Sequence, residues 1–330
     1  MDPVTQGALG AAWAQPAAGR RTMLVVTAVG CAAGMAPDLD VLIRSNADPL
    51  LAIELHRHFT HSVVFIPFGA IFCALLVYPF AKSALSFPAC YGFSVLGYAS
   101  HGLLDACTSY GTLLFWPFSR ERVAWDLVSV IDPLVTLPLM ALAVLAMAKK
   151  RGIFALMGCF WCLGYFLLGF AQNQRAEHAV AELAQARGHS PDFVEAKPSL
   201  GNILLWRTLY LHDGRFYVDA VRVARSTLLF EGGSRMALDP DRDYPELSAS
   251  SQQRRDIERF AWFADGYLAV DPDRPTRIVD LRYSLVPNSL DAFWGIEIEP
   301  AAADDVHVSY VTMRARSLEE GKQLIAMLFR

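Results

Sequence analysis

The stretch HRHFTHSVVFIPFGAIFCALLVYPFA (residues 56–81) joins a histidine-rich motif to a long apolar run. The run at 62–81 is long enough to cross a membrane as a helix, which takes about 20 apolar residues. Imidazole groups at the end of such a span are costly unless they hold a ligand or a partner. The stretch therefore predicts a membrane protein with a functional site at one end of a span.

Four further stretches have the length and apolar character of membrane spans: 22–43, 88–108, 129–148 and 152–171. A sixth, 4–19, is shorter, rich in Gly and Ala, and interrupted by Gln6, Gln15 and Pro16. We expect this segment to span as well, packing through its small residues, although a re-entrant segment fits the same pattern.

Charge is distributed unevenly along the chain. Residues 1–171 hold 10 Lys and Arg and 9 Asp and Glu, whereas residues 172–330 hold 19 and 24. A change of solvent near residue 172 explains this difference. We therefore expect the fold to be mainly α, a polytopic membrane helix bundle of five or six spans (1–171), followed by a small α+β soluble domain (172–330). The net charge of −5 in the second half argues against nucleic acid as a partner.

The soluble half alternates between helical and strand-like patterns. A hairpin is expected at 203–223 around Asp213-Gly214, because Asp-Gly favours a tight turn between strands. Helices are expected at 176–188, 251–264 and 318–329, and strands at 277–286, 293–299 and 307–315.

Polar residues of the membrane half collect where one span ends and the next begins. With alternating spans, these ends lie on one membrane face. His101 and Asp105 are four residues apart, so both project from one side of a helix. Mixed imidazole and carboxylate ligands suit Zn²⁺, and also Mn²⁺ or Fe²⁺. The candidate metal ligands are Asp38, Asp40, His56, His61, His101 and Asp105.

Several of the polar residues have simpler explanations. Asp132 precedes Pro133 and has the pattern of a helix N-cap. Asp38 also fits a cap or an interfacial residue, and Arg120 and Arg122 fit interfacial anchors. The convergence of the whole group favours a shared metal site over these separate roles.

The motifs MDPVTQGALGAA, PDLD, HRHFTHS, SHGLLDACTSYGTLLFWPFS and WDLVSVIDP occur in this order. Together they resemble the bacterial inner-membrane, membrane-bound metal-dependent hydrolases of the YdjM type, over about residues 1–135. The segments NILLWRTLYLHDGRFYV and VDLRYS resemble the long form of that family, which carries a C-terminal soluble domain. A weaker similarity is to zinc-dependent phospholipases C. The resemblance implies metal-dependent hydrolysis and leaves the substrate open. His58 occupies a variable position of the motif.

The leading hypothesis is a membrane-embedded hydrolase that acts on a lipid-like or membrane-anchored ester or phosphoester. A divalent ion would activate water and polarise the scissile bond. Asp126 or Asp132 would be the general base or would orient a ligand histidine, while Arg57 and Arg120 (with Arg122) would bind an anionic group.

Two other classes remain open: a metal or ion transporter, and a structural or regulatory membrane protein. Inward His and Asp clusters also mark ion pathways, but here the polar residues lie at one membrane face. The distribution of Lys and Arg predicts that the site and the C-terminal domain are extracytoplasmic in a multi-pass inner-membrane protein.

Overall fold

The structure, a computed structural model, describes residues 1–313 and 318–330. The chain forms two compact units. Unit 1 comprises Met1–Ile43, Leu55–Ala171 and Leu200–Asn202. Unit 2 comprises Arg44–Glu54, Gln172–Ser199 and Ile203–Arg330.

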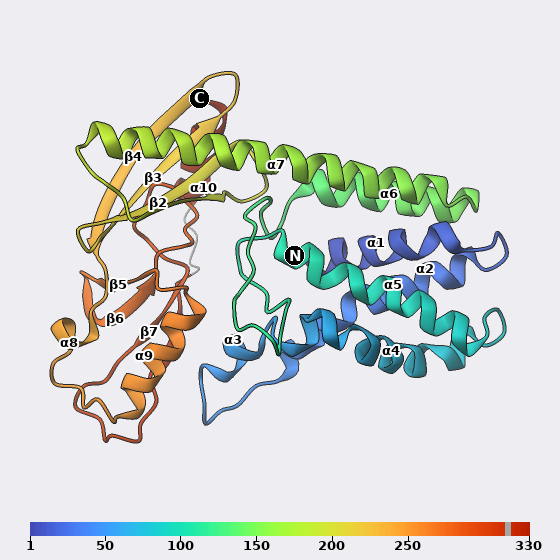
Figure 1. The fold of residues 1–330 in the computed structure, drawn as a ribbon, viewed down its shortest axis with the longest axis horizontal. Coiled ribbons are helices and arrows are strands. Elements are labelled where there is room, and N and C mark those ends of the chain that lie inside the picture. Colours follow the sequence, from blue (N-terminus) through green and yellow to red (C-terminus); the bar gives the residue numbers. More distant parts are fainter. Residues whose placement is uncertain (314–317) are drawn as a thin grey trace. The chain divides into compact units, whose positions relative to one another are not determined.

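Unit 1 is helical (Figure 1). Its α-helices are α1 (Pro3–Ala14), α2 (Met23–Met35), α4 (Ile66–Ala81), α5 (Phe87–Ala106), α6 (Pro133–Lys149) and the first part of α7 (Ile153–Ala186). Short 3₁₀ helices extend or link them: η1 (Gln15–Ala17), η2 (Ala36–Leu42), η3 (Phe59–His61) and η4 (Val63–Phe65). Helices α1, α2 and α5 pack against one another, α4 packs on α5, and α6 packs on α1.

Glycines allow the backbones of α1, α2 and α5 to approach closely. A Cβ atom at Gly10 of α1 would overlap the Gly30 carbonyl of α2, and one at Gly97 of α5 would overlap the same carbonyl. Small residues at such contacts are typical of membrane helix packing. The close approach brings the C-terminal end of α2 against α5, where the candidate ligands lie.

Among the residues that the structure describes, three helices are long and apolar enough to cross a membrane: Met23–Leu42, Val63–Ala81 and Ile153–Ala186. Helix α6 is apolar but has only 17 residues, and α1 has 12, which is shorter than a span requires. Five or six spans are therefore not confirmed. Side chains on α4 such as Phe68, Leu75 and Phe80 are more than half exposed, as expected of a surface that faces lipid.

Helix α7 is continuous for 34 residues and crosses from unit 1 into unit 2. The helix expected separately at 176–188 is therefore the second half of α7, with Gly188 beyond its end at φ +77°. The change in composition at residue 172 falls within one continuous helix, at the boundary between the two units, and the backbone does not break there.

The described residues of unit 2 form two four-stranded antiparallel sheets, ordered β1-β2-β3-β4 and β5-β6-β7-β8. The strands are β1 (Phe193–Pro198), β2 (Leu205–His212), β3 (Arg215–Val223), β4 (Thr227–Met236), β5 (Leu268–Asp271), β6 (Arg274–Asp280), β7 (Trp294–Glu297) and β8 (Ser309–Thr312). The helices are α3 (Leu51–Leu55, whose last residue falls in unit 1), α8 (Pro240–Asp243), α9 (Gln252–Phe263) and α10 (Leu318–Phe329).

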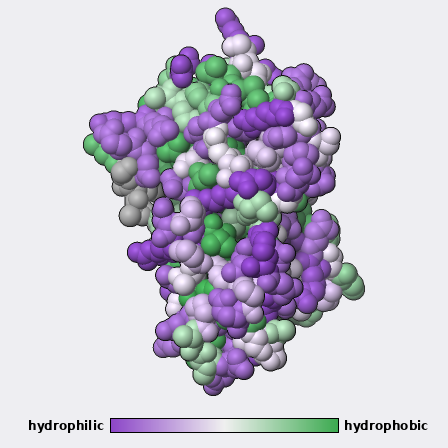
Figure 2. Space-filling model, turned by 90° about the vertical axis from the view of Figure 1, so that its left-hand side faces the viewer, coloured by the Kyte–Doolittle hydropathy of each residue, from purple (hydrophilic) through white to green (hydrophobic). Residues whose placement is uncertain are grey.

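Both sheets contribute to one core in unit 2. Phe216 and Val218 of the first sheet pack with Ala269 and Val279 of the second. Where this unit is seen in Figure 2, hydrophilic residues predominate on its surface. This distribution is that of a folded domain in contact with water.

Most expected elements of unit 2 are confirmed. Strands β2 and β3 pair around Asp213 and Gly214, which have φ +48° and +68°, as an Asp-Gly hairpin turn requires. Helices α9 and α10 occupy the expected stretches, and β7 and β8 lie within theirs. Strand β6 begins at Arg274, before the expected start at 277, and ends at Asp280, well before the expected end at 286. The end of the predicted strand 307–315 falls on residues 314–315, outside the described part of the chain.

Candidate metal centre

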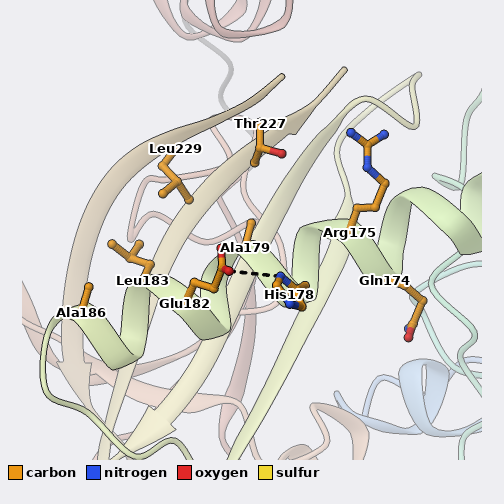
Figure 3. Close-up of a pocket in the computed structure, with 9 residues that line it drawn as sticks. All are labelled: Gln174, Arg175, His178, Ala179, Glu182, Leu183, Ala186, Thr227 and Leu229. Carbon is orange, nitrogen blue, oxygen red and sulfur yellow. Dashed lines mark ion pairs between the residues drawn. The ribbon is translucent and has the colours of Figure 1, made fainter. Parts of the chain in front are cut away.

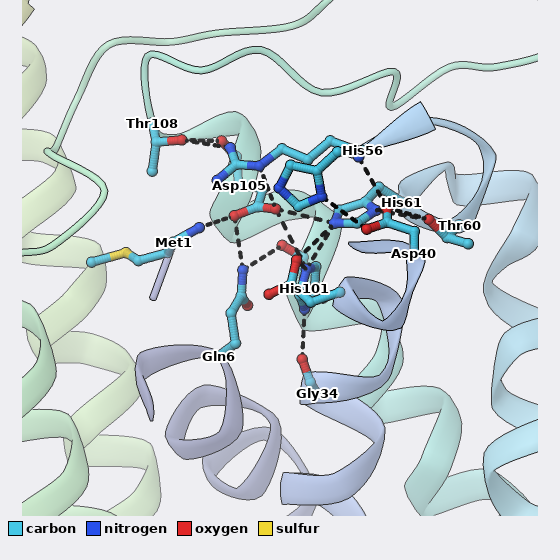
Figure 4. A network of polar contacts seen from close by, with 12 residues as sticks. Met1, Gln6, Gly34, Asp40, His56, Thr60, His61, His101, Asp105 and Thr108 are labelled. Atoms are coloured by element: carbon cyan, nitrogen blue, oxygen red, sulfur yellow. Dashed lines mark hydrogen bonds and ion pairs between the residues drawn. The ribbon is translucent and has the colours of Figure 1, made fainter. Parts of the chain in front are cut away.

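Four side chains of unit 1 bring potential metal-binding atoms within 4.8 Å of one another: Asp38, His61, His101 and Asp105. Figure 4 labels three of them, His61, His101 and Asp105. Asp38 lies on η2, His61 on η3, and the other two on α5. Asp38 also belongs to a second group with Asp40 and His56, in which the ligand atoms obey the same limit. The six candidate ligands thus form two adjoining groups that share Asp38.

Helix α5 presents His101 and Asp105 from successive turns, as their spacing requires. Both side chains are fully buried. The Nδ1 atom of His101 lies 2.6 Å from the carbonyl oxygen of Gly34 at the end of α2. Because a carbonyl only accepts hydrogen bonds, Nδ1 carries the proton and Nε2 of a neutral His101 presents a lone pair.

The tautomer of His61 is determined in the same way, by the partners of its Nδ1 atom. Its Nδ1 atom lies 3.0 Å from Thr60 Oγ1 and 3.3 Å from Asp40 Oδ2, and Thr60 donates its own hydroxyl proton to that carboxylate oxygen. Nδ1 of His61 is therefore the donor in this arrangement. Gly102 of α5 lets the His61 backbone approach, since a Cβ atom there would overlap the His61 carbonyl.

The two Nε2 atoms face each other at 2.9 Å. Asp38 Oδ1 lies 3.5 Å from His61 Nε2 and 3.4 Å from His101 Nε2. Asp105 Oδ2 is buried and lies 3.3 Å from His61 Nε2 and 3.4 Å from His101 Nε2. Two lone pairs and two carboxylate oxygens that converge on one point demand a cation between them. This donor set fits a divalent metal ion.

The pKa of His61 also indicates that this point favours positive charge. Burial alone would lower the pKa of His61, but hydrogen bonds to Asp105, Asp38 and Asp40 outweigh burial and raise it to about 10. The surrounding carboxylates therefore favour the positively charged form of His61. The carboxylates stabilise positive charge at this point, which is the property that a metal site needs.

Asp105 has further partners that balance its buried charge. Arg57 Nε lies 3.2 Å from Oδ2, Gln6 donates to Oδ1 at 2.9 Å, and the Met1 amino group also contacts Oδ1. Arg57 is only 4% exposed, has φ +61°, and donates to Thr108 Oγ1. Its guanidinium is thus a buried counter-charge for Asp105, beside the cluster.

Asp40 accepts hydrogen bonds from several sides. Its oxygens contact His56 Nδ1 at 2.8 Å, the Arg57 backbone N–H at 3.0 Å and Thr60 Oγ1 at 3.0 Å. The carboxylate therefore orients His56 and His61. The His56 side chain is 23% exposed, whereas those of His61 and His101 are 0% exposed. A partly exposed imidazole held by a carboxylate is suited to exchange protons.

The remaining predicted catalytic residues lie elsewhere. Asp132 caps α6 and accepts from the Leu134 N–H and the Tyr165 hydroxyl, so the N-cap explanation describes its contacts. Asp126 has φ +52°, and Arg120 is exposed. None of these three belongs to either ligand group found among the described residues. His58 packs against Trp116, with ring centroids 5.6 Å apart.

One important contact carried no signal in the sequence. The Gly34 carbonyl determines which nitrogen of His101 faces the cluster, yet a backbone acceptor cannot be recognised from residue type. Thr60 and Gln6 are visible in the motifs, but their hydrogen bonds to Asp40 and Asp105 depend on the 3₁₀ turns and on the packing of α1.

A pocket lies in unit 2, between α7 and β4 (Figure 3). Its volume is about 810 Å³, and its lining includes Gln174, Arg175, Leu183 and Leu229. One ion pair joins His178 to Glu182 at 3.7 Å, and both side chains are at least 70% exposed. Exposed pairs of this kind are common on helices, and this pocket has none of the buried, convergent chemistry of the cluster.

The half of the chain that holds the cluster matches a known protein family. The family described as YdjM inner membrane protein matches residues 1–176. The uncharacterized protein YfhP of Bacillus subtilis is 28% identical over 153 residues, 46% of this chain and 46% of that protein. The inner membrane protein YbcI of Escherichia coli is 31% identical over 105 residues, 31% of this chain and 60% of that protein.

The chain thus spans less than two thirds of the length of these relatives. No solved structure matches it. All six candidate ligands fall within the region that the family covers. The chain belongs to the YdjM family of inner membrane proteins.

Proposed function

We propose that this protein is a membrane-embedded, metal-dependent hydrolase that cleaves an ester or phosphoester in a lipid-like or membrane-anchored substrate. The observation that carries the proposal is the convergence of His61 and His101 Nε2 with Asp38 and Asp105 on one point. A divalent ion bound there, with Zn²⁺ favoured by the two imidazoles and Mn²⁺ or Fe²⁺ as alternatives, would act as a Lewis acid and lower the pKa of water.

The residues around the ligands have distinct tasks in this proposal. Asp40 holds His61 in the required tautomer and aligns His56. His56, the most exposed of the three clustered histidines, takes a proton from the attacking water and returns it to the leaving group. Arg57 offsets the charge of Asp105.

The membrane location supports an amphiphilic substrate. Asp38 and Asp40 lie near the end of Met23–Leu42, and His61 lies just before Val63–Ala81, both candidate membrane spans. A water-soluble metabolite gains nothing from a site at the end of a span. A lipid or a membrane-anchored ester presents its head group at that depth.

A hydrolysis assay with the purified full-length protein tests the proposal. We expect release of product from ester or phosphoester lipids, loss of activity with a chelator, and recovery with one of the three metals. His61→Ala should be inactive, whereas His178→Ala, an exposed histidine of α7, should keep full activity. Failure to release product from any lipid would contradict hydrolysis and favour a transporter. Equal turnover of water-soluble esters would contradict the substrate class.

A further inference from the structure

Two apolar cavities lie beside the metal centre in unit 1. One, of about 310 Å³, lies between η2, α4 and α5, with Asp40 and Thr60 in its lining. The other, of about 140 Å³, has His61 and Thr60 in its lining. Each cavity therefore reaches a residue of the cluster, while the rest of its lining is almost wholly apolar.

Tyr98 of α5 forms a wall of both cavities. Its hydroxyl donates to the Thr60 carbonyl at 2.8 Å, and its ring lies directly over Gly69, where a Cβ atom would overlap it. Thr60 in turn contacts Asp40 and His61. The wall of the cavities is thus connected to the residues that orient the metal ligands.

The larger cavity extends from the surface into the protein. At its rim, Leu39 and Phe72 are 53% and 56% exposed, while Cys73, deeper in the lining, is 5% exposed. The two rim residues lie on Met23–Leu42 and Val63–Ala81, two helices apolar and long enough to span a membrane. The rim therefore faces hydrocarbon when these helices are in a bilayer, and a lipid chain can enter sideways.

We propose that the larger cavity binds one hydrocarbon chain of a membrane lipid and so places the polar head of that lipid at the metal centre. This proposal rests on the proposed function only in what happens to the head group. Binding of the hydrocarbon chain itself needs no hydrolysis. An apolar chain is the fitting occupant, since a polar ligand would leave its groups without partners along this lining. The hydrocarbon chain also accounts for an apolar cavity that has Asp40 in its lining.

Photolabelling tests this site. The full-length protein is placed in phosphatidylethanolamine and phosphatidylglycerol vesicles that contain a phospholipid with a diazirine at the end of one acyl chain. A chelator is present, so that labelling reports binding of the chain and no turnover. We expect the label on the peptide that carries Phe72 and Cys73. Its loss is expected in Cys73→Phe, which fills the cavity, and in Phe72→Asn, which makes the rim polar.

Leu75→Phe is the matched control. Leu75 lies on the same helix, is 59% exposed, and does not line the cavity. Two residues beyond Cys73, it points to another side of α4. Labelling of this variant should equal that of the wild type. Equal labelling of all four proteins would overturn the proposal, because it would show only lipid at the outer surface.

Thermal unfolding of each variant checks its fold. If Cys73→Phe does not fold, Phe72→Asn decides the question, because residue 72 is exposed and tolerates substitution. Chain labelling without any hydrolysis would leave this site standing and count against the proposed function alone. If the protein hydrolyses lipids but its cavity takes no label, the proposed function stands and the chain-binding site is overturned.

Discussion

His61 and His101 face each other through their Nε2 atoms at 2.9 Å, while the Nδ1 atom of each ring is engaged as a donor on its other side. In neutral rings this geometry sets two lone pairs against each other. A proton or a metal ion must lie between them for the arrangement to be stable. The first prediction follows from this relationship.

The purified protein should contain a divalent metal bound through the two histidine motifs. Elemental analysis should find metal in the wild type and little in His61→Ala or Asp105→Asn, since each variant removes one of four converging ligands. His178→Ala removes an exposed histidine and should retain the metal. An equal metal content in the wild type and the two ligand variants would show that the cluster binds none.

Asp40→Asn tests the role of Asp40 as an orienting residue. The amide keeps the size of the side chain but loses the charge and one acceptor, so His61 and His56 lose their common partner. We expect metal affinity to fall roughly 10- to 100-fold, as it does when groups behind metal ligands are removed. A chelator competition assay measures this fall. Complete loss of metal would instead indicate that Asp40 is a direct ligand of the second group.

The sequence predicts much of the candidate site, because helical spacing and span alternation are local or topological properties. The interval between His101 and Asp105 places both on one face of α5, and the alternation of span ends places Asp38 and His61 near them. Which carboxylate faces the imidazoles and which one orients them was not predictable. It depends on the 3₁₀ turns η2 and η3, which direct Asp38 toward the imidazoles and Asp40 toward Thr60 and His56.

Some elements of the fold could be predicted from the sequence and others could not. Turn chemistry identified the hairpin of β2 and β3, since Asp-Gly specifies its own backbone angles. Strands β1, β4 and β5 were not predicted: no residue of β4 is buried and only two are in each of β1 and β5, so their sequences carry little of the apolar pattern by which a strand is recognised. The loop 44–54 belongs to unit 2, although it lies between two ligand motifs in the sequence. Nothing near it in the sequence indicates its partner, which is some 200 residues away.

That partner is Arg259 of α9. Its guanidinium donates to both carboxylate oxygens of Asp48, at 3.1 and 2.8 Å, and to Glu54 at 2.6 Å. Glu54 is two residues from His56, so the loop connects this contact to the motif. Arg259→Gln should therefore increase amide hydrogen exchange in residues 48–54 by roughly tenfold, as expected for loss of about 1.4 kcal/mol of local stability.

Arg255→Gln is the control for this change. Arg255 lies on the same helix but donates to the Ser250 carbonyl and to Gln252, both close to it in sequence. Exchange in residues 48–54 should not change in this variant. If Arg259→Gln exchanged as slowly as the wild type, the ion pairs would contribute nothing measurable to the order of the loop.

Acid should release the same loop. Burial raises the pKa of Asp48, but the Arg259 hydrogen bond, the Leu50 N–H and the charge of Arg259 outweigh it and hold the pKa below 3.8. A lowered carboxyl pKa gives stability that is present above the unfolded value of 3.8 and is lost as pH falls through the folded value. Limited proteolysis of the loop should therefore accelerate only below about pH 4. Arg259→Gln should remove this pH dependence, and a wild type cleaved equally at pH 3 and 6 would contradict the expectation.

The last prediction concerns orientation in the membrane. The connections on the side opposite the cluster carry six Lys and Arg: Arg20, Arg21, Lys82, Lys149, Lys150 and Arg151. The cluster side carries four, Arg44, Arg57, Arg120 and Arg122, of which Arg57 is buried against Asp105. Because Lys and Arg near span ends favour the cytoplasm, we expect the cluster and the C-terminal unit to face away from it. Alkaline phosphatase fused after Arg330 should be active, since this enzyme folds only outside the cytoplasm, and a fusion at Lys149 should be inactive. The opposite pair of results would reverse the orientation and place the metal centre on the cytoplasmic side.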